Sequence, residues 1–336
     1  MSSPITRPVL IIGGSGIVGA KAAQTLRQLH PELPIAIGGR DLTKAMSVAE
    51  PLGNATAVMI DLGRNDLGQD EISSYSAVAV FVKDDTLNSM KYAQAHGLPY
   101  LSVSSGVFEV GPEMALAIRR PESAPILMAS NWLAGAATFP ALQVARDFRA
   151  IDHISITVVL DEEDMGGPAA FADFQRLTES APNPLLLKDG RWNWAKGEDA
   201  KRKFIDIDGT EVEANAYSPL DVLSLSTATN ARSIHFDLVY GVSASRRKGE
   251  AFSTEIAIEL SGELSSGKQA RRRLDIVHPH GQAPLTALHV ALGIERLLGL
   301  SGGAPVKPGL YLPDLLMDPD NVVDRMKEFG ALFYQK

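Results

Sequence analysis

A glycine-rich segment near the start of the chain, GGSGIVG at residues 13–19, constrains the fold more than any other feature. It follows the apolar run Val9–Ile12 and precedes Ile17–Leu29, whose apolar residues recur at helical spacing. Gly14, Gly16 and Gly19 match the pattern GxGxxG, and this strand–turn–helix context makes the pattern informative. We expect Gly14 to allow the tight turn, Gly16 to admit a pyrophosphate to the backbone, and Gly19 to let helix and strand pack closely.

The start of the predicted helix is a candidate phosphate site, because free N–H groups at a helix start attract anions. The alternative is a glycine-rich turn that binds no ligand. On the first interpretation the loop contacts a dinucleotide through five consecutive residues: Gly14, Ser15, Gly16, Ile17 and Val18.

The end of the second predicted strand, GGRD at residues 38–41, indicates which dinucleotide is bound. NAD-binding proteins usually place an acidic residue here, whereas this chain has Gly39 and Arg40. A guanidinium suits a 2′-phosphate, so the sequence favours NADP(H) over NAD. Asp41 is interpreted as a helix cap rather than the ribose acid. Asp61 and Leu62 close the third strand near the expected adenine edge, although Asp61 is equally compatible with a helix cap.

Strands and helices alternate through residues 1–150, which predicts a Rossmann-type, doubly wound parallel sheet of the α/β class. Further strands are expected at 35–37, 57–60, 77–82, 100–103 and 126–128. Helices are expected at 41–52, 86–96 and 113–119. The uncharged stretch 123–145 is interrupted by proline, asparagine and glycine. We interpret it as a buried strand, a loop and a helix rather than a membrane span.

The pattern changes near residue 151, and residues 151–282 predict a second, α+β domain built on a mainly antiparallel sheet. Asp189-Gly190 and Asp208-Gly209 each separate two β-rich runs, which is typical of tight hairpins. Helices are expected at 284–298 and 321–329, and residues 283–336 are expected to return to the first domain. The long antiparallel strands are compatible with a homodimer.

Charge and cysteine content exclude several classes of protein. The net charge is −8, with 40 acidic and 32 basic residues, which opposes a general nucleic-acid or membrane surface. The chain has no cysteine, which excludes disulfides, thiolate nucleophiles and cysteine-ligated metals. The apolar run before the glycine motif is too short for a signal peptide. We therefore expect a cytoplasmic protein that acts on a small-molecule substrate and has no metal site.

Five sequence segments resemble the saccharopine dehydrogenase-like oxidoreductases: GGSGIVG, GGRD, AHGLPYLSVSSG, PLTALHVALGIERLLG and KPGLYLPDLLMDPD. Their order and spacing match along most of the chain. The resemblance implies a Rossmann domain, an inserted mixed-sheet substrate domain, a C-terminal return to the first domain and often a dimer. It also implies reduction or oxidation at C–N bonds of amino acids, or some enoyl reductions.

Two residues are candidate proton donors for hydride transfer. Lys83 follows the fourth strand, where it would donate a proton, hold a carboxylate or bond the nicotinamide ribose; the alternative is a solvated lysine. His280 lies where the second domain returns to the first, and its alternative is a structural histidine at a turn. Val82 and Ser104 end neighbouring strands and are candidate cofactor contacts. Weaker candidates are Ser105, Asn131 and Tyr217.

Three charged clusters are expected to be solvated: the acidic run 161–164 and the basic runs 246–248 and 271–273. The sequence thus predicts an NADP(H)-dependent oxidoreductase that transfers hydride to or from a polar, amino-acid-like imine or carbonyl. One alternative is an atypical short-chain reductase, although the chain has no Tyr-x-x-x-Lys pair. The other alternative is a non-catalytic NADP-binding sensor or scaffold.

Overall fold

The computed structural model describes residues 5–70, 74–164 and 166–336, and internal contacts divide the chain into two compact units. Unit 1 comprises Met1–Ser130 and Thr286–Met317, and unit 2 comprises Asn131–Leu285 and Asp318–Lys336. These bounds differ from the expected domain bounds of 1–150, 151–282 and 283–336. The last nineteen residues stay with unit 2 because β16 (Leu332–Gln335) pairs with β14 (Gln269–His278) in the second sheet.

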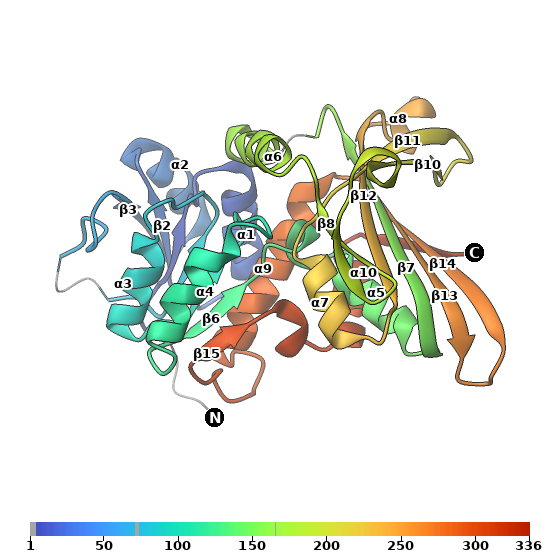
Figure 1. Cartoon of the computed structure of the whole chain (residues 1–336). Coiled ribbons are helices and arrows are strands. Elements are labelled where there is room, and N and C mark those ends of the chain that lie inside the picture. Colours follow the sequence, from blue (N-terminus) through green and yellow to red (C-terminus); the bar gives the residue numbers. More distant parts are fainter. Residues whose placement is uncertain (1–4, 71–73, 165) are drawn as a thin grey trace. The chain divides into compact units, whose positions relative to one another are not determined.

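Unit 1 contains a seven-stranded sheet in which every pairing is parallel (Figure 1). The chain order on either side of β1 and β4 reverses, which creates a topological switch point. The central strands are wholly apolar because both faces of such a sheet are covered. In spatial order the strands are β15 (Gly309–Tyr311), β6 (Pro125–Met128), β5 (Tyr100–Ser102), β4 (Ala77–Val80), β1 (Val9–Ile12), β2 (Ile35–Gly39) and β3 (Ala55–Met59).

The crossover helices of unit 1 lie where the sequence placed them. Right-handed connections put α1 and α2 on one face of the sheet and α3 and α4 on the other. The bounds are α1 (Ile17–Leu29), α2 (Leu42–Leu52), α3 (Asn88–His96) and α4 (Val110–Arg119), with most of α9 (Gln282–Leu298) added from the C-terminal part. Asp41 caps α2 as predicted, since its side chain accepts a hydrogen bond of 3.1 Å from the Lys44 N–H.

Unit 2 is built on a nine-stranded sheet that is mainly antiparallel, as predicted. The exception is β12, which runs parallel to β7 over nine residue pairs. The main path is β10 (Lys201–Ile205), β11 (Glu211–Ala216), β12 (Ser233–Gly241), β7 (Phe148–Asp161), β13 (Thr254–Leu264), β14 and β16; β8 (Leu185–Lys188) pairs with β12 and β9 (Arg191–Trp194).

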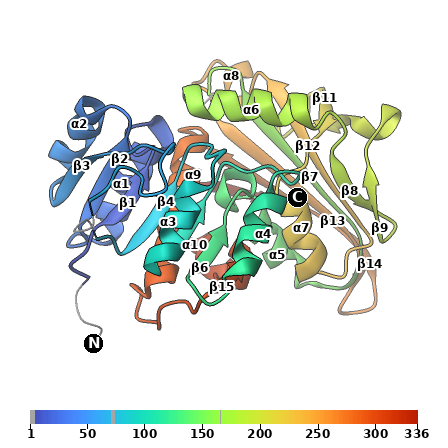
Figure 2. The same ribbon diagram turned by 60° about the vertical axis from the view of Figure 1, so that its left-hand side comes forward.

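Strand β7 shows how the two faces of this sheet differ. Ile154, Ile156 and Val158 are fully buried on the face that carries α5 (Thr138–Ala145) and α7 (Asp221–Ala228), with α10 (Pro319–Glu328) packed on α5 (Figure 2). Ser155 and Thr157 point to the opposite face, because successive strand residues alternate. Unit 2 also contains α6 (Pro168–Ser180) and α8 (Ala244–Arg247). Together with α7, β15 and β16, helix α6 was not predicted.

The two aspartate–glycine turns differ in geometry. Asp189 and Gly190 have φ values of 50° and 74°, so both are left-handed, as the tight hairpin requires. In the second turn only Gly209 is left-handed, with φ 89°. That turn is longer, because the Asp206 N–H donates to the Thr210 carbonyl at 2.9 Å.

The prediction that the charged clusters are solvated is wrong for the acidic run and for the basic run at 246–248. Asp161 is buried and lies 2.7 Å from Arg246, which also reaches Glu163 at 3.0 Å. Arg247 pairs with buried Asp206 and, at 2.8 Å, with Asp208. Internal ion pairs offset the desolvation of these charges, and local sequence does not reveal such partners.

The uncharged stretch folds as predicted into a strand, β6, followed by a loop and a helix, α5. In the part of the chain that the structure describes, no helix is long and apolar enough to cross a membrane. Among these same residues no cluster of three or more His, Asp or Glu side chains is arranged to hold a metal ion.

Candidate functional site

The carboxyl ends of β1, β2, β4 and β5 meet at one edge of the unit 1 sheet, because parallel strands point the same way. The segments at the ends of these strands and of β3 carry the residues that the sequence predicted as cofactor contacts. The site is therefore built from segments far apart in the chain that the strand order brings together.

The glycine loop after β1 has the predicted tight turn, but the roles of its first two glycines differ from those expected. The left-handed residue is Gly13, with φ 79°, rather than Gly14. Position 14 requires glycine because the backbone segments approach each other closely there: a Cβ on Gly14 would lie 2.8 Å from the Ile11 carbonyl oxygen. A Cβ on Gly19 would lie 2.4 Å from the Gly13 carbonyl oxygen, so Gly19 does let α1 pack against the loop.

The start of α1 fits a phosphate group. Its N-cap residue, Gly16, provides no capping side chain, and the first turn contains no acidic residue. The N–H groups of Ile17 and Val18 have no partner within the helix. Gly16 and Ile17 are exposed, so a ligand reaches these donors directly. Backbone donors at the positive end of a helix, without a Cβ to shield them, suit the pyrophosphate of a dinucleotide.

The end of β2 lies beside the glycine loop. A Cβ on Gly39 would come within 3.4 Å of the Ser15 hydroxyl, which shows how closely the two segments approach. Arg40 follows and is exposed, and its guanidinium has no hydrogen bond or ion pair with any residue that the structure describes. The carboxylate of Asp41 is used at the start of α2, where the Lys44 ammonium also lies 3.9 Å away. Arg40 is therefore the side chain available at this position for an anionic group.

The segment after β3 is a turn. Asp61 accepts a hydrogen bond of 2.9 Å from the Gly63 N–H, and residues 62–68 continue as turns rather than a helix. The helix-cap alternative for Asp61 is therefore wrong. The Leu62 carbonyl accepts hydrogen bonds from the Thr86 hydroxyl and the Asn88 amide, at 2.9 and 2.8 Å. These bonds tie this rim of the site to the loop before α3.

Lys83 lies just beyond β4 and is largely enclosed, so its interpretation as a solvated lysine is wrong. Its side chain is 20% exposed and its ammonium lies 3.4 Å from the Glu109 carboxylate. Glu109 is held in turn by the Gly106 N–H at 2.8 Å. Val82, the preceding residue, touches the glycine loop, since a Cβ on Gly13 would lie 2.9 Å from its side chain.

Sequence reasoning missed Glu113, which completes a polar cluster with Lys83 and Glu109. The Ser105 hydroxyl donates to one Glu113 oxygen at 2.8 Å, and the other oxygen has no hydrogen-bond partner among the described residues. Burial raises the pKa of Glu113, while Ser105 and Lys83 oppose the shift. Glu109 and Glu113 are four residues apart at the start of α4, so helical spacing was the available signal. Ser104 is buried nearby on the chain, directly after β5.

The other candidates lie in unit 2. His280 is exposed in the turn after β14, and its N–H donates to His278 Nδ1 at 3.3 Å. The Asn131 amide is buried and donates to Thr138 and Ser224, at 2.8 and 3.1 Å. Burial raises the pKa of Tyr217, whose ring packs edge-on against Trp132. Asn131 and Tyr217 thus belong to a packed region of unit 2, in which Asn131 Oδ1 has no hydrogen-bond partner among the described residues.

The architecture as a whole is that of a two-unit protein with a Rossmann-type unit and a mixed-sheet unit. No protein-family model matches the sequence, and no curated protein is similar to it. Among solved structures the chain is similar to apo saccharopine dehydrogenase (L-Glu forming) from Saccharomyces cerevisiae. That match has a TM-score of 0.71 and 13% identity, and it covers 98% of this chain and 99% of that one.

A second similar structure is amine dehydrogenase from Mycobacterium smegmatis, with a TM-score of 0.52 and 12% identity over 93% of this chain and 96% of that one. The chain therefore has a saccharopine dehydrogenase-like fold, which confirms the fold that the motifs predicted.

Proposed function

We propose that the chain is an NADP(H)-dependent oxidoreductase that transfers hydride to or from a polar imine or carbonyl of an amino-acid-like substrate. The observation that carries the proposal is the edge formed by the glycine loop, the uncapped start of α1 and Arg40, which has no partner among the described residues. The saccharopine dehydrogenase-like fold supports it, because the fold places this edge at a topological switch point.

The residues of unit 1 divide into those that bind the dinucleotide and those that handle a proton. The backbone N–H groups of Ile17 and Val18 bind the pyrophosphate, since those of Gly14 and Gly16 already donate to backbone carbonyls, and Arg40 binds the 2′-phosphate. A bound nicotinamide dinucleotide supplies the hydride-transfer chemistry. Lys83 holds a proton at Nζ and is oriented by Glu109, and burial raises the pKa of the neighbouring Glu113.

Arg40→Ala tests the choice of cofactor. We expect this variant to bind NADPH about 10- to 100-fold more weakly, since one charge-assisted contact is lost, and NADH almost unchanged. The measurement is a fluorescence titration with each reduced nucleotide. Arg119→Ala is the matched control, because Arg119 is exposed at the far end of α4, near the opposite edge of the sheet. Equal losses for the two nucleotides would rule out the 2′-phosphate contact.

A further inference from the structure

The second face of the unit 2 sheet carries polar side chains at the positions where three neighbouring strands are paired. Thr157 of β7 lies beside Asp237 of β12, and Ser155 of β7 lies beside Glu259 of β13. These positions alternate with the apolar residues that are buried under α5 and α7, so their side chains project from the opposite face. Ser155 and Thr157 are two residues apart and therefore lie about 6.6 Å from each other along β7.

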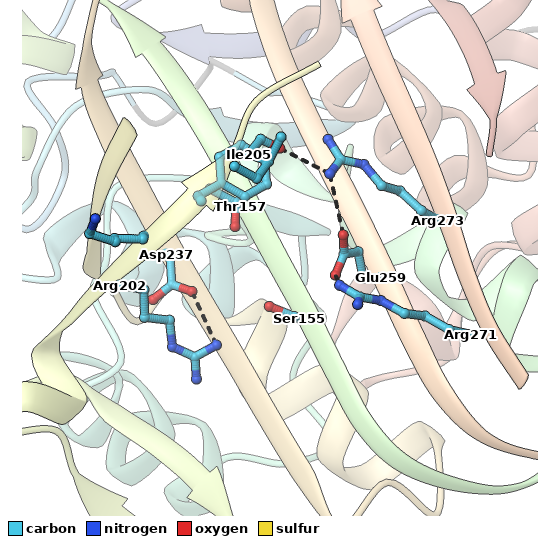
Figure 3. Close-up of a pocket in the computed structure, with 10 residues that line it drawn as sticks. Ser155, Thr157, Arg202, Ile205, Asp237, Glu259, Arg271 and Arg273 are labelled. Carbon is cyan, nitrogen blue, oxygen red and sulfur yellow. Dashed lines mark hydrogen bonds and ion pairs between the residues drawn. The ribbon is translucent and has the colours of Figure 1, made fainter. Parts of the chain in front are cut away.

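Strand β10 covers part of this face and leaves a half-open cavity of about 410 Å³, within the range of small-molecule sites. Phe204 of β10 packs against apolar residues of β7, β11 and β12. In Figure 3 the side chain of Ser155 lies between Arg202 on one side and Arg271 on the other. The cavity thus has strand hydroxyls at its floor and a guanidinium group on either side of them.

Three side chains of the cavity have donors that no described residue uses. The hydroxyls of Ser155 and Thr157 form no hydrogen bond with the described residues, and neither oxygen is sealed off from the cavity. The guanidinium of Arg202 forms none with them either, and its side chain is 36% exposed. Its ion-pair partner, Asp237 Oδ2, lies 3.8 Å away, beyond hydrogen-bond reach. A guanidinium has five N–H donors and each hydroxyl has one, so this set suits a ligand with many acceptors.

Positive charge exceeds negative charge among the residues that line the cavity. Lys203 and Arg273 are held by carboxylates of residues outside the lining, 2.7 Å away in each case. Arg271 donates one hydrogen bond to Glu259 and is 71% exposed, so most of its donors stay available. Arg202 and Arg271 are therefore the cations that an anionic ligand can reach. The charged residues of the lining are Arg202, Lys203, Arg271, Arg273, Asp237 and Glu259.

Two titratable neighbours show that the charge of Arg202 is poorly balanced within the fold. The pKa of His235, which lies beside Ser155 on β12, is lowered to about 4 by burial and by the charge of Arg202. Burial raises the pKa of Asp237 to about 6, which means that its ionised form is disfavoured. Asp237 is thus a weak counter-ion for Arg202, both because it is buried and because it lies too far away for a hydrogen bond.

We infer that this cavity binds a phosphate group, with the guanidinium of Arg202 and the hydroxyls of Ser155 and Thr157 as its donors. The tetrahedral oxygens of a phosphate can accept two parallel bonds from the guanidinium and one bond from each hydroxyl. A carboxylate has only two oxygens in one plane, which suit the guanidinium but do not reach both hydroxyls as well. Arg271 provides a second positive charge for a dianion. The inference uses unit 2 residues alone and does not depend on dinucleotide binding.

Calorimetric titration of the full chain with inorganic phosphate, glycerol 3-phosphate and ribose 5-phosphate tests the site. We expect at least one of these ligands to bind with a Kd in the millimolar range or tighter. Glycerol and ribose, which lack the phosphate, should bind about tenfold more weakly or not at all. Tighter binding of an ester than of inorganic phosphate would identify a phosphorylated molecule as the ligand, and the reverse order would identify the free ion. Failure of all three phosphates to bind would overturn the inference.

Variants locate the binding within the cavity. Arg202→Gln should weaken phosphate binding by about tenfold or more, and Ser155→Ala by about three- to tenfold. Lys201→Gln is the matched control, since Lys201 is exposed on the same strand and does not line the cavity. If Ser155→Ala does not fold, the more exposed Arg202 still decides the result.

The candidate dinucleotide site of unit 1 also suits phosphate, so Arg40→Ala separates the two sites. This variant should bind the tested phosphates like the wild type, while Arg202→Gln should bind NADPH like the wild type. Phosphate binding that is lost in Arg40→Ala and kept in Arg202→Gln would place the ion in unit 1 and overturn the inference. The two proposals therefore fail independently.

Discussion

Replacing Gly19 by alanine should destabilise unit 1 even in the absence of any ligand. The added Cβ would lie 2.4 Å from the Gly13 carbonyl oxygen and 2.9 Å from Gly14 Cα. Both are backbone atoms, so the loop or the helix has to move by about 1 Å to restore ordinary contact distances. Overpacking of this kind costs about 1–3 kcal/mol, and better helix propensity returns at most about 1 kcal/mol. We expect a net loss of about 1–2 kcal/mol.

Gly16→Ala separates binding from stability at the same loop. A Cβ on Gly16 would lie 3.2 Å from the Gly13 carbonyl oxygen, a tight contact at an exposed residue, so stability should change little. The same Cβ would cover the donors at the start of α1, and NADPH binding should weaken by about 10- to 100-fold. Urea unfolding and a nucleotide fluorescence titration measure the two effects independently.

Gly111→Ala is the control for both variants. Gly111 lies in the first turn of α4, has no left-handed φ, and a Cβ there would have open space within 4 Å. This variant should be as stable as the wild type or slightly more so, with unchanged NADPH affinity. The reasoning is refuted if Gly19→Ala is as stable as Gly111→Ala, or if Gly16→Ala binds NADPH like the wild type.

Two further outcomes are expected. Lys83→Met should lower turnover by about 10²- to 10⁴-fold on the best substrate of an imine and keto-acid panel. Its NADPH affinity should change no more than that of the control variant Lys21→Met. An equal loss of turnover and NADPH affinity would make Lys83 a binding residue only. Asp237, faced by the Arg202 charge, has its pKa raised by burial from 3.8 to about 6, so its stabilising contribution is complete below about pH 4 and lost as pH rises through 6. The unfolding free energy of the wild type relative to Asp237→Asn should therefore fall by up to about 3 kcal/mol between pH 4 and 7, and a flat difference would contradict the buried state of this carboxyl.

The parts of the fold that follow from local signals were predictable. The helices and strands of the Rossmann-type unit have strongly periodic apolar residues, and the N-cap residue Asp41 indicated where α2 starts. Helix α7 was missed because its segment, DVLSLSTA, is rich in β-branched and hydroxyl residues; burial of Val222 and Leu225 against the sheet overrides that weak propensity. The short strands β15 and β16 exist only through pairing with β6 and β14, which no local pattern encodes.

The candidate dinucleotide site was largely predictable from the sequence. In the cluster around Lys83, only Lys83 itself was predicted. Position at a strand end identified Lys83, because the doubly wound topology gathers such residues at one edge. Its partner Glu109 lies on the next crossover, and the pairing depends on β4 and β5 being neighbours in space. The loop glycines show the same limit at short range: the pattern placed the turn, but only backbone geometry distinguishes the left-handed Gly13 from the closely packed Gly14.

The alternation of apolar and polar residues in β7 suggests that its polar face is exposed to water, which is wrong for part of that face. A strand with Ile154, Ile156 and Val158 on one face and Ser155 and Thr157 on the other usually turns the polar face to water. Here part of that face is covered by β10, which comes later in the chain. Thr157 and Asp237 of this polar row are buried, and burying a polar group that is not fully hydrogen-bonded, as Asp237 is not among the described residues, costs free energy.

The unmet groups around the glycine loop of unit 1 indicate the charge of the ligand that this edge selects. Around the glycine loop the groups without a partner among the described residues are donors, namely the backbone N–H groups at the start of α1 and the guanidinium of Arg40, whereas the unmet Glu113 oxygen belongs to the cluster around Lys83. Such a set selects a ligand rich in acceptors, such as a phosphorylated dinucleotide.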